Sequence, residues 1–203
     1  MNDGSASSPY QAALAHGQHA LTDTILALAL DMLLQDGVSA LSMRRLAQAA
    51  GCSTTVLYTL FGAKNGIIDA LYLEGFRRLG AAQAALPASD DPVQRILDLC
   101  RSYRQVALAN PAHYAIMFGG ALRDFTPSAA SKAAALGFMQ PLIEAVQAAL
   151  AAGLLSGQAA ESFGVALWSV AHGFVSLELA GMHASPDHAE ALYIATVRRL
   201  LAE

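Results

Sequence analysis

Charged side chains are scarce in this sequence. Only 14% of its 203 residues are Asp, Glu, Lys or Arg, against roughly 25% in typical soluble domains, whereas 55% are hydrophobic. This composition excludes disorder over the chain as a whole. It also predicts more apolar helix surface than one subunit buries, so we expect self-association.

Motifs of catalysis and metal binding are missing as well. The sequence has no HExxH motif, no phosphate-binding loop, no GxSxG motif and no CxxC pair, and Cys52 and Cys100 lie far apart. His16 and His19 are three residues apart but lack a third metal ligand. We therefore expect no enzyme, no metal site and no cofactor.

Long apolar runs are also lacking. The charge-free stretches 145–160 and 162–177 are each 16 residues long, which is shorter than the ~18 apolar residues that a membrane span needs. Residues 1–20 have neither the basic start nor the apolar run of a signal peptide. These absences predict a cytoplasmic protein that does not interact with a membrane.

Positive charge is concentrated in one region of an acidic chain. The net charge is −4, yet five cations gather between residues 44 and 78: Arg44, Arg45, Lys64, Arg77 and Arg78. Any contact with nucleic acid must therefore use a local patch rather than the charge of the whole molecule.

Helical periodicity runs through the chain, and no segment alternates convincingly with a period of two, so we expect an all-α fold of about nine helices. Residues 1–20, rich in Gly, Ser and Ala, are expected to form a flexible arm. The later helices are expected at about 112–119, 128–152, 158–181 and 187–202.

Two short helices near the N-terminus have a specific spacing. One follows the capping residue Ser42, the next follows Ser53, and only Gly51, Cys52 and Ser53 separate them. This spacing is typical of a helix-turn-helix, whose second helix can enter the major groove of DNA.

The helix at 158–181 is apolar on two nearly opposite faces. One stripe is Phe163, Leu167, Val170, Phe174 and Leu177, and the other is Val165, Trp168, His172, Val175 and Leu179. One stripe must face a partner, and the spacing leaves open which. With the last helix, we expect a dimer interface of two helices per subunit that includes Phe163, Leu167, Val170, Phe174, Leu192, Thr196 and Leu200.

A cluster of aromatic residues is a candidate ligand pocket. The residues that would line it are Tyr103, Tyr114, Met117, Phe118, Phe138, Trp168 and His172. The alternative is that the aromatic rings fill the core and that His172 is a core histidine bonded to a backbone carbonyl. A pocket of this composition would take a small apolar or aromatic ligand.

Several segments resemble the TetR family of bacterial regulators. They are ILALALDMLLQDG, LSMRRLAQAAGCSTTVLYTLFGAK and NGIIDALY in the N-terminal region. Farther along, YRQVALANPAHYAIMFGG and LWSVAHGFVSLELAG resemble a C-terminal regulatory domain named for its Trp, His and Gly. The resemblance implies an arm at 1–20, a helix-turn-helix DNA-binding domain at 21–66, and a ligand-binding and dimerisation domain at 67–203.

The resemblance also implies which residues meet DNA. Phosphate contacts fall on Arg44, Tyr58 and Lys64, with Ser42 and Ser53 at the helix starts. Thr54, Thr55 and Thr59 project from the expected recognition helix and can contact base edges; the alternative for Thr54 and Thr55 is that they only cap or solvate that helix. Gly66 sits in the first turn of the following helix, costs up to about 1 kcal/mol of helix propensity, and suggests a soft hinge.

The function implied is a repressor that binds a palindromic double-stranded operator as a homodimer and is released by an unidentified small molecule. The alternative is a helical ligand-binding protein whose N-terminal helix-turn-helix domain, here called the head, no longer binds DNA.

Overall fold

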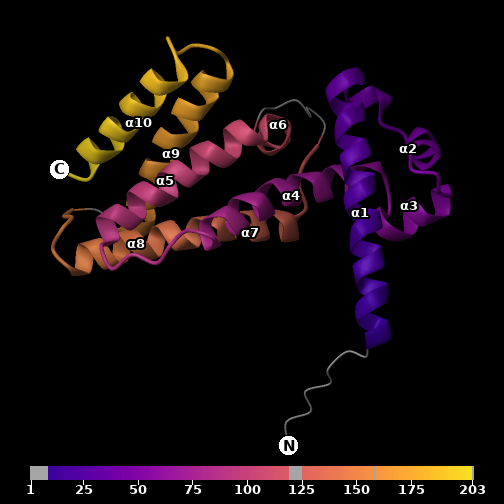
Figure 1. Ribbon diagram of the computed structural model, residues 1–203, viewed down its shortest axis with the longest axis horizontal. Helices are drawn as coiled ribbons and strands as arrows, with labels where there is room; N and C mark the ends of the chain where they lie inside the picture. The colour runs from indigo at the N-terminus through magenta and orange to yellow at the C-terminus, as the bar shows by residue number, and fades with distance from the viewer. Residues whose placement is uncertain (1–8, 119–124, 158, 203) are drawn as a thin grey trace, which may run out of the picture. The chain divides into compact units, whose positions relative to one another are not determined.

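The computed structural model describes residues 9–118, 125–157 and 159–202. Within these ranges the chain contains helices and no strands, which confirms the expected all-α fold (Figure 1). The elements are α1 (Pro9–Asp36), the 3-10 helix η1 (Val38–Ala40), α2 (Met43–Ala49), α3 (Thr54–Phe61), α4 (Lys64–Ala84), α5 (Pro92–Ala109), α6 (Pro111–Phe118), α7 (Ala129–Leu136), the 3-10 helix η2 (Gly137–Met139), α8 (Gln140–Ala151), α9 (Ala160–Leu179) and α10 (Pro186–Leu200).

The chain divides into two compact units. The first comprises Met1–Leu71 with Leu122–Phe125, and the second comprises Tyr72–Ala121 with Thr126–Glu203. The division falls inside α4, whereas the sequence predicts a boundary at residue 66, near the start of that helix.

The first helix is longer than expected. α1 begins at Pro9, so residues 9–20, which the sequence analysis assigns to a flexible arm, are helical in the structure. Proline suits a first helical position because its missing N–H has no partner in the first turn, and the following Ala-rich segment favours helix. Residues 1–8 of the predicted arm lie outside the described part of the chain.

The helix expected at 128–152 is divided into α7, η2 and α8. η2 at Gly137–Met139 interrupts the α-helical pattern, and α8 restarts with Pro141 in its first turn. Proline inside an α-helix removes a hydrogen bond, so a new helix start is the favourable arrangement. The break brings Phe138 into the core of the second unit.

The second unit is built around α5, α8 and α9, with α10 lying beside α9 (Figure 1). Its core includes the fully buried Ile96, Val146 and Tyr193. The Tyr193 hydroxyl donates a hydrogen bond of 3.0 Å to the backbone carbonyl of Cys100. Burial raises the pKa of the Cys100 thiol to about 11, so this cysteine stays protonated.

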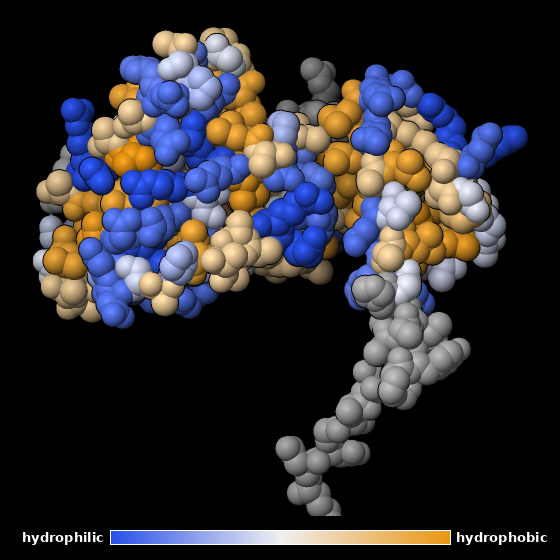
Figure 2. All heavy atoms as spheres, viewed as in Figure 1, coloured by the Kyte–Doolittle hydropathy of each residue, from blue (hydrophilic) through white to orange (hydrophobic). Residues whose placement is uncertain are grey.

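The buried face of α9 lies between the two stripes that the sequence suggests. It consists of Ala160, Gly164, Leu167, Ala171 and Val175, which takes one residue from each predicted stripe. The small residues let α9 approach its neighbours closely. Valine and leucine side chains on the other side stay exposed on this unit, as do further apolar residues across its surface (Figure 2).

Two helical stretches are long and apolar enough to cross a membrane by length and composition alone, Ala129–Ala151 and Ala160–Leu179. The sequence analysis does not predict these stretches as membrane spans, because each contains charged residues within it or near its ends. Both contribute buried residues to the core of the second unit, among them Val146 and Leu167, as core helices do.

A buried guanidinium group joins α5 to α9 and α10. Arg104 donates two hydrogen bonds to Glu178, of 2.8 and 2.7 Å, one of 2.7 Å to Glu190, and one of 3.1 Å to the carbonyl of Pro186. The side chain of Glu178 is only 10% exposed, so Arg104, and not water, is the main partner of its carboxylate. The network orients the C-terminal helix pair against the core.

We predict that Arg104→Met lowers the free energy of unfolding by about 3–5 kcal/mol, because Glu178 keeps a buried charge without its partner. The control is Arg101→Met on the same helix, whose ion pair with Asp98 is partly exposed and should cost below about 1 kcal/mol. Urea unfolding at one fixed protein concentration, followed by circular dichroism, measures both. Equal losses for the two variants would contradict the structural role of Arg104.

Candidate nucleic-acid interface and ligand site

The helix-turn-helix forms because both of its helices have defined starts and the turn between them is glycine-based. The Ser42 hydroxyl accepts a hydrogen bond from the Arg45 N–H at 3.2 Å, which caps α2. Gly51 then adopts a positive φ of 64°, which ends the helix, and the Cys52 N–H donates back to the carbonyl of Ala47. α3 begins two residues later and packs against α2.

Apolar residues fix the orientation of α3 in the first unit. Leu57 is fully buried, together with Leu46 of α2 and Ile25 of α1, and the start of α4 adds Ile67 and Leu71 to the same unit. With Leu57 directed inward, the polar residues of α3 must lie on its outer face.

The predicted base-reading residues lie on that exposed face. Thr54, Thr55 and Thr59 are all exposed, and Tyr58 beside them is 53% exposed. The Thr59 hydroxyl donates to the Thr55 carbonyl at 2.9 Å, so it is engaged within its own helix. Ser53 stands at the N-cap position of α3, and its hydroxyl makes no capping hydrogen bond to that helix.

The cations of the predicted patch differ in how they are paired. Arg45 forms an ion pair of 2.8 Å with Asp36 and also donates to the carbonyl of Ala40. Arg44, the preceding residue of α2, has an exposed side chain that forms no ion pair within the described ranges. Lys64 is half-buried at the first turn of α4. The positive charge most available to a phosphate is therefore that of Arg44.

Gly66 has a steric role that the sequence did not reveal. A Cβ atom at this position would overlap the carbonyl oxygen of Phe61. The Gly66 N–H also donates to the carbonyl of Ala63 at 2.9 Å, which closes the turn that leads into α4. The glycine thus permits a close backbone approach, and the soft hinge suggested by its low helix propensity is not needed to explain it.

The aromatic residues of the predicted ligand pocket pack on one another. The ring of Phe118 lies 5.1 Å from that of Tyr114 and 4.8 Å from that of His172, and Phe138 lies 5.6 Å from Trp168. Between these rings and the core, the cavity lined by Tyr103, Phe138 and Trp168 measures about 20 Å³. A space of that size holds a water molecule and no larger ligand.

Polar atoms inside this aromatic cluster satisfy one another. The hydroxyl of Tyr114 lies 2.7 Å from Nδ1 of His172 and 3.3 Å from the hydroxyl of Ser176, and the Trp168 N–H donates to Tyr103 at 3.4 Å. Burial lowers the pKa of His172 and raises that of Tyr103, so both stay neutral. The partners of Nδ1 of His172 are therefore tyrosine hydroxyl groups. The sequence analysis gave a backbone carbonyl as the alternative partner of this histidine.

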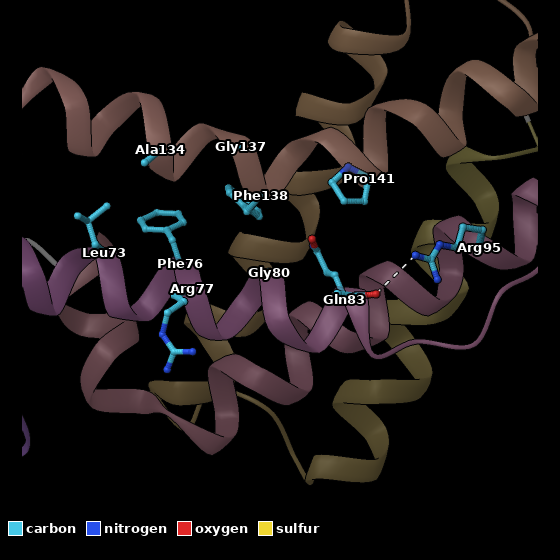
Figure 3. Close-up of a pocket in the computed structure, with 11 residues that line it drawn as sticks. Leu73, Phe76, Arg77, Gly80, Gln83, Arg95, Ala134, Gly137, Phe138 and Pro141 are labelled. Atoms are coloured by element: carbon cyan, nitrogen blue, oxygen red, sulfur yellow. Dashed lines mark hydrogen bonds between the residues drawn. The ribbon is translucent and has the colours of Figure 1, made fainter. Parts of the chain in front are cut away.

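A larger hollow lies on the other side of Phe138. A groove of about 460 Å³ runs between α4 and the segment from α7 to the start of α8, and Phe76, Phe138 and Pro141 form its walls (Figure 3). Gln83 projects from α4 toward Phe138 and Pro141, while Arg95 approaches from α5. Of the predicted pocket residues, Phe138 lines this groove. The feature of the sequence that could have indicated this groove is Gln83, a glutamine on the buried side of α4. Helical periodicity alone does not show that this position is buried.

The described residues offer no metal-binding cluster. No group of three or more His, Cys, Asp or Glu side chains among them could hold an ion. Cys52, in the turn of the helix-turn-helix, is half-buried and forms no disulfide.

Family models match both parts of the chain. The model described as "Bacterial regulatory proteins, tetR family" matches residues 25–71, and the one described as "Tetracyclin repressor-like, C-terminal domain" matches residues 96–200. With the exposed helix of the helix-turn-helix, these matches define a helix-turn-helix transcriptional regulator. The C-terminal match alone spans half of the chain, and the protein belongs to the TetR family.

Solved structures share the fold over most of their length. A protein with unknown function from Rhodococcus sp. RHA1 is 28% identical, with a TM-score of 0.76 over 89% of this chain and 93% of the other. PfmR, a TetR family transcriptional regulator from Thermus thermophilus, is 22% identical, with a TM-score of 0.66 over 87% and 96%. A TetR variant from Acinetobacter baumannii AYE in complex with minocycline is 22% identical, with a TM-score of 0.59 over 89% and 93%. A comparison with curated proteins gave no match.

We predict that Gly66→Ala destabilises the protein by about 1–3 kcal/mol, because the added Cβ forces the backbone at Phe61 to shift. Gly17→Ala is the matched control: it lies in α1, where an added Cβ meets no atom within 4 Å, and should gain up to about 1 kcal/mol. Urea unfolding compares the two. If Gly66→Ala were as stable as Gly17→Ala, the close backbone approach would not be the reason for the glycine.

We predict that His172 makes stability fall on acidification. Its folded-state pKa lies below the ordinary value of 6.5, so the unfolded chain binds the proton first and the folded state loses stability as the pH falls below 6.5. The loss of unfolding free energy between about pH 7.5 and about pH 5.5 should be smaller in His172→Phe than in the wild type. An equal pH dependence in His172→Phe and the wild type would contradict the assignment.

Proposed function

We propose that the protein is a transcriptional repressor that binds a palindromic operator as a homodimer and is released by a small molecule. The observation that carries the proposal is the exposed polar face of α3, with Thr54, Thr55 and Tyr58 directed away from a buried Leu57. A helix that is anchored on one face and polar on the other is the element that enters the major groove.

The residues of the interface divide into two roles. Arg44, Tyr58 and Lys64 contact phosphates, with the N-terminal ends of α2 and α3 at Ser42 and Ser53 as further donors. Thr54, Thr55 and Thr59 face base edges, where a threonine offers a hydroxyl or a methyl group. Thr55 is the first candidate for direct readout, because the hydroxyl of Thr59 is engaged within its helix at 2.9 Å.

The homodimer is proposed to form through the outer faces of α9 and α10. Val165 and Leu177 are each 51% exposed on α9, and Leu192 is 44% exposed on α10. Leu167, expected in the interface, is fully buried in its own subunit and has no surface left for a partner. Phe163, Val170, Phe174, Thr196 and Leu200 are half-buried and would lie at the border of such an interface.

Release by a ligand requires that the two units share a structural element, and α4 is that element. Its first residues belong to the first unit and its later residues to the second. In the second unit Gly75 lies so close to Met117 of α6 that an added Cβ would overlap the sulfur atom. Movement of α6 or of the groove wall would thus be passed to α4. A coupling of about 1–3 kcal/mol would reduce DNA affinity about 5- to 150-fold.

We further propose that the protein acts in the cytoplasm without catalytic activity. Membership of a family of transcriptional regulators supports both statements. The small-molecule ligand is the only non-protein component that the proposal requires besides DNA.

We predict that Tyr58→Phe and Lys64→Ala weaken binding to operator and random duplexes by similar factors. Lys64→Ala should also lower the slope of log affinity against log salt by about 0.9, because one phosphate is no longer neutralised. Thr55→Ala should instead reduce the preference for the operator by about tenfold, because it removes an interaction with a base. Fluorescence anisotropy with the two duplexes measures all variants.

Thr24→Ala is the matched control for Thr55→Ala, because the Thr24 hydroxyl donates to a carbonyl of its own helix in α1. It should bind both duplexes like the wild type. If the three interface variants lowered specific and random binding by the same factor, the division into phosphate and base contacts would be wrong.

A further inference from the structure

The groove beside α4 has the size and walls of a small-molecule site. Its volume is about 460 Å³, within the range of about 300–1,000 Å³ for ligand pockets. Leu73 and Phe76 of α4 line one side of it, and Ala134, Phe138 and Pro141 line the other (Figure 3). These side chains present almost only carbon to an occupant, so the body of the ligand must be apolar.

One buried polar atom in the wall of the groove is unsatisfied. Gln83 is 4% exposed, and its buried Oε1 has no hydrogen-bond partner within the described part of the chain. Figure 3 shows the side chain extending from α4 into the space near Phe138 and Pro141. A buried acceptor without a donor is costly, and a ligand that supplies the donor removes that cost.

The cations at the border of the groove already have protein partners. Arg95 donates to the backbone carbonyls of Pro87 at 3.2 Å and of Gln83 at 3.5 Å. Arg77 is held by the carboxylate of Glu74. A carboxylate ligand would have to displace these bonds and would also meet the amide oxygen of Gln83, so the site favours an uncharged molecule.

We propose that this groove binds an uncharged apolar molecule that donates one hydrogen bond, from a hydroxyl or N–H group, to Oε1 of Gln83. The inference rests on the proposed release by a small molecule and names the chemical class of that ligand. Gln83 and Phe138 also line the small inner cavity beside Tyr103 and Trp168. An occupant of the groove therefore contacts the same two side chains that close the aromatic cluster.

The test compares three probes of similar shape by isothermal titration calorimetry, without DNA. They are 2-naphthol, which donates a hydrogen bond, 2-methoxynaphthalene, which does not, and 2-naphthoate, which is an anion. The wild type should bind 2-naphthol at least about tenfold more tightly than either of the others. Gln83→Leu should abolish this preference by weakening only the binding of 2-naphthol.

Two further variants locate the site. Gly80 lines the groove, and a Cβ there would meet no atom within 4 Å, so Gly80→Leu should fill the groove without strain and prevent binding of all three probes. Gln105→Leu, the same substitution as Gln83→Leu at an exposed position of α5, should bind like the wild type.

Four results would overturn the inference: no binding of any probe, equal binding of 2-naphthol and 2-methoxynaphthalene, tighter binding of 2-naphthoate, or wild-type binding by Gly80→Leu. Each concerns the ligand alone. Because DNA binding is measured separately, a protein that reads its operator but fails these titrations would retain the proposed regulatory role and lose only the assigned ligand class.

Discussion

The division of one helix between two cores is the constraint on which the rest of the structure depends. α4 buries Ile67, Ile68 and Leu71 in the first unit and Phe76 and Leu79 in the second. Neither unit can be completed without its share of this helix. Hydrophobic burial fixes each part of α4 against its neighbours within its own unit. The same helix carries Gln83 in the groove and begins at Lys64, a proposed phosphate contact.

In the second unit, Phe138 separates a closely packed aromatic cluster from an open groove. On one side, His172 and its hydroxyl partners complete a packed aromatic cluster, in which polar groups are matched and little space remains. On the other side, the groove contains a buried oxygen without a donor among the described residues. An unmatched polar group in an apolar hollow marks a binding site more specifically than aromatic residues do, because aromatic residues also fill cores.

Periodicity and local signals were sufficient to predict the helix-turn-helix itself. The Ser42 hydroxyl caps α2 and Gly51 ends it, and both effects can be read from neighbouring residues. Ser53 marks the start of α3 by its position, although its hydroxyl makes no capping hydrogen bond. The extension of α1 to Pro9 and the break at Gly137–Met139 were missed, since alanine-rich segments fit both a helix and a loop, and proline fits both a helix start and a helix end. On α9 two overlapping stripes were compatible with the spacing, and only packing selected the face that contains Leu167. The groove depends on three segments meeting in space, which no local pattern encodes.

The most direct test of the account is binding of the wild-type protein to a labelled duplex from the region upstream of its own gene, with a scrambled duplex as control, at two salt concentrations. We expect tight binding that prefers the native duplex, weakens steeply with salt because phosphates are neutralised, and saturates at two chains per duplex. Equally weak binding to both duplexes, with no sequence enriched in a selection from genomic fragments, would contradict it and favour a ligand-binding protein whose head no longer reads DNA.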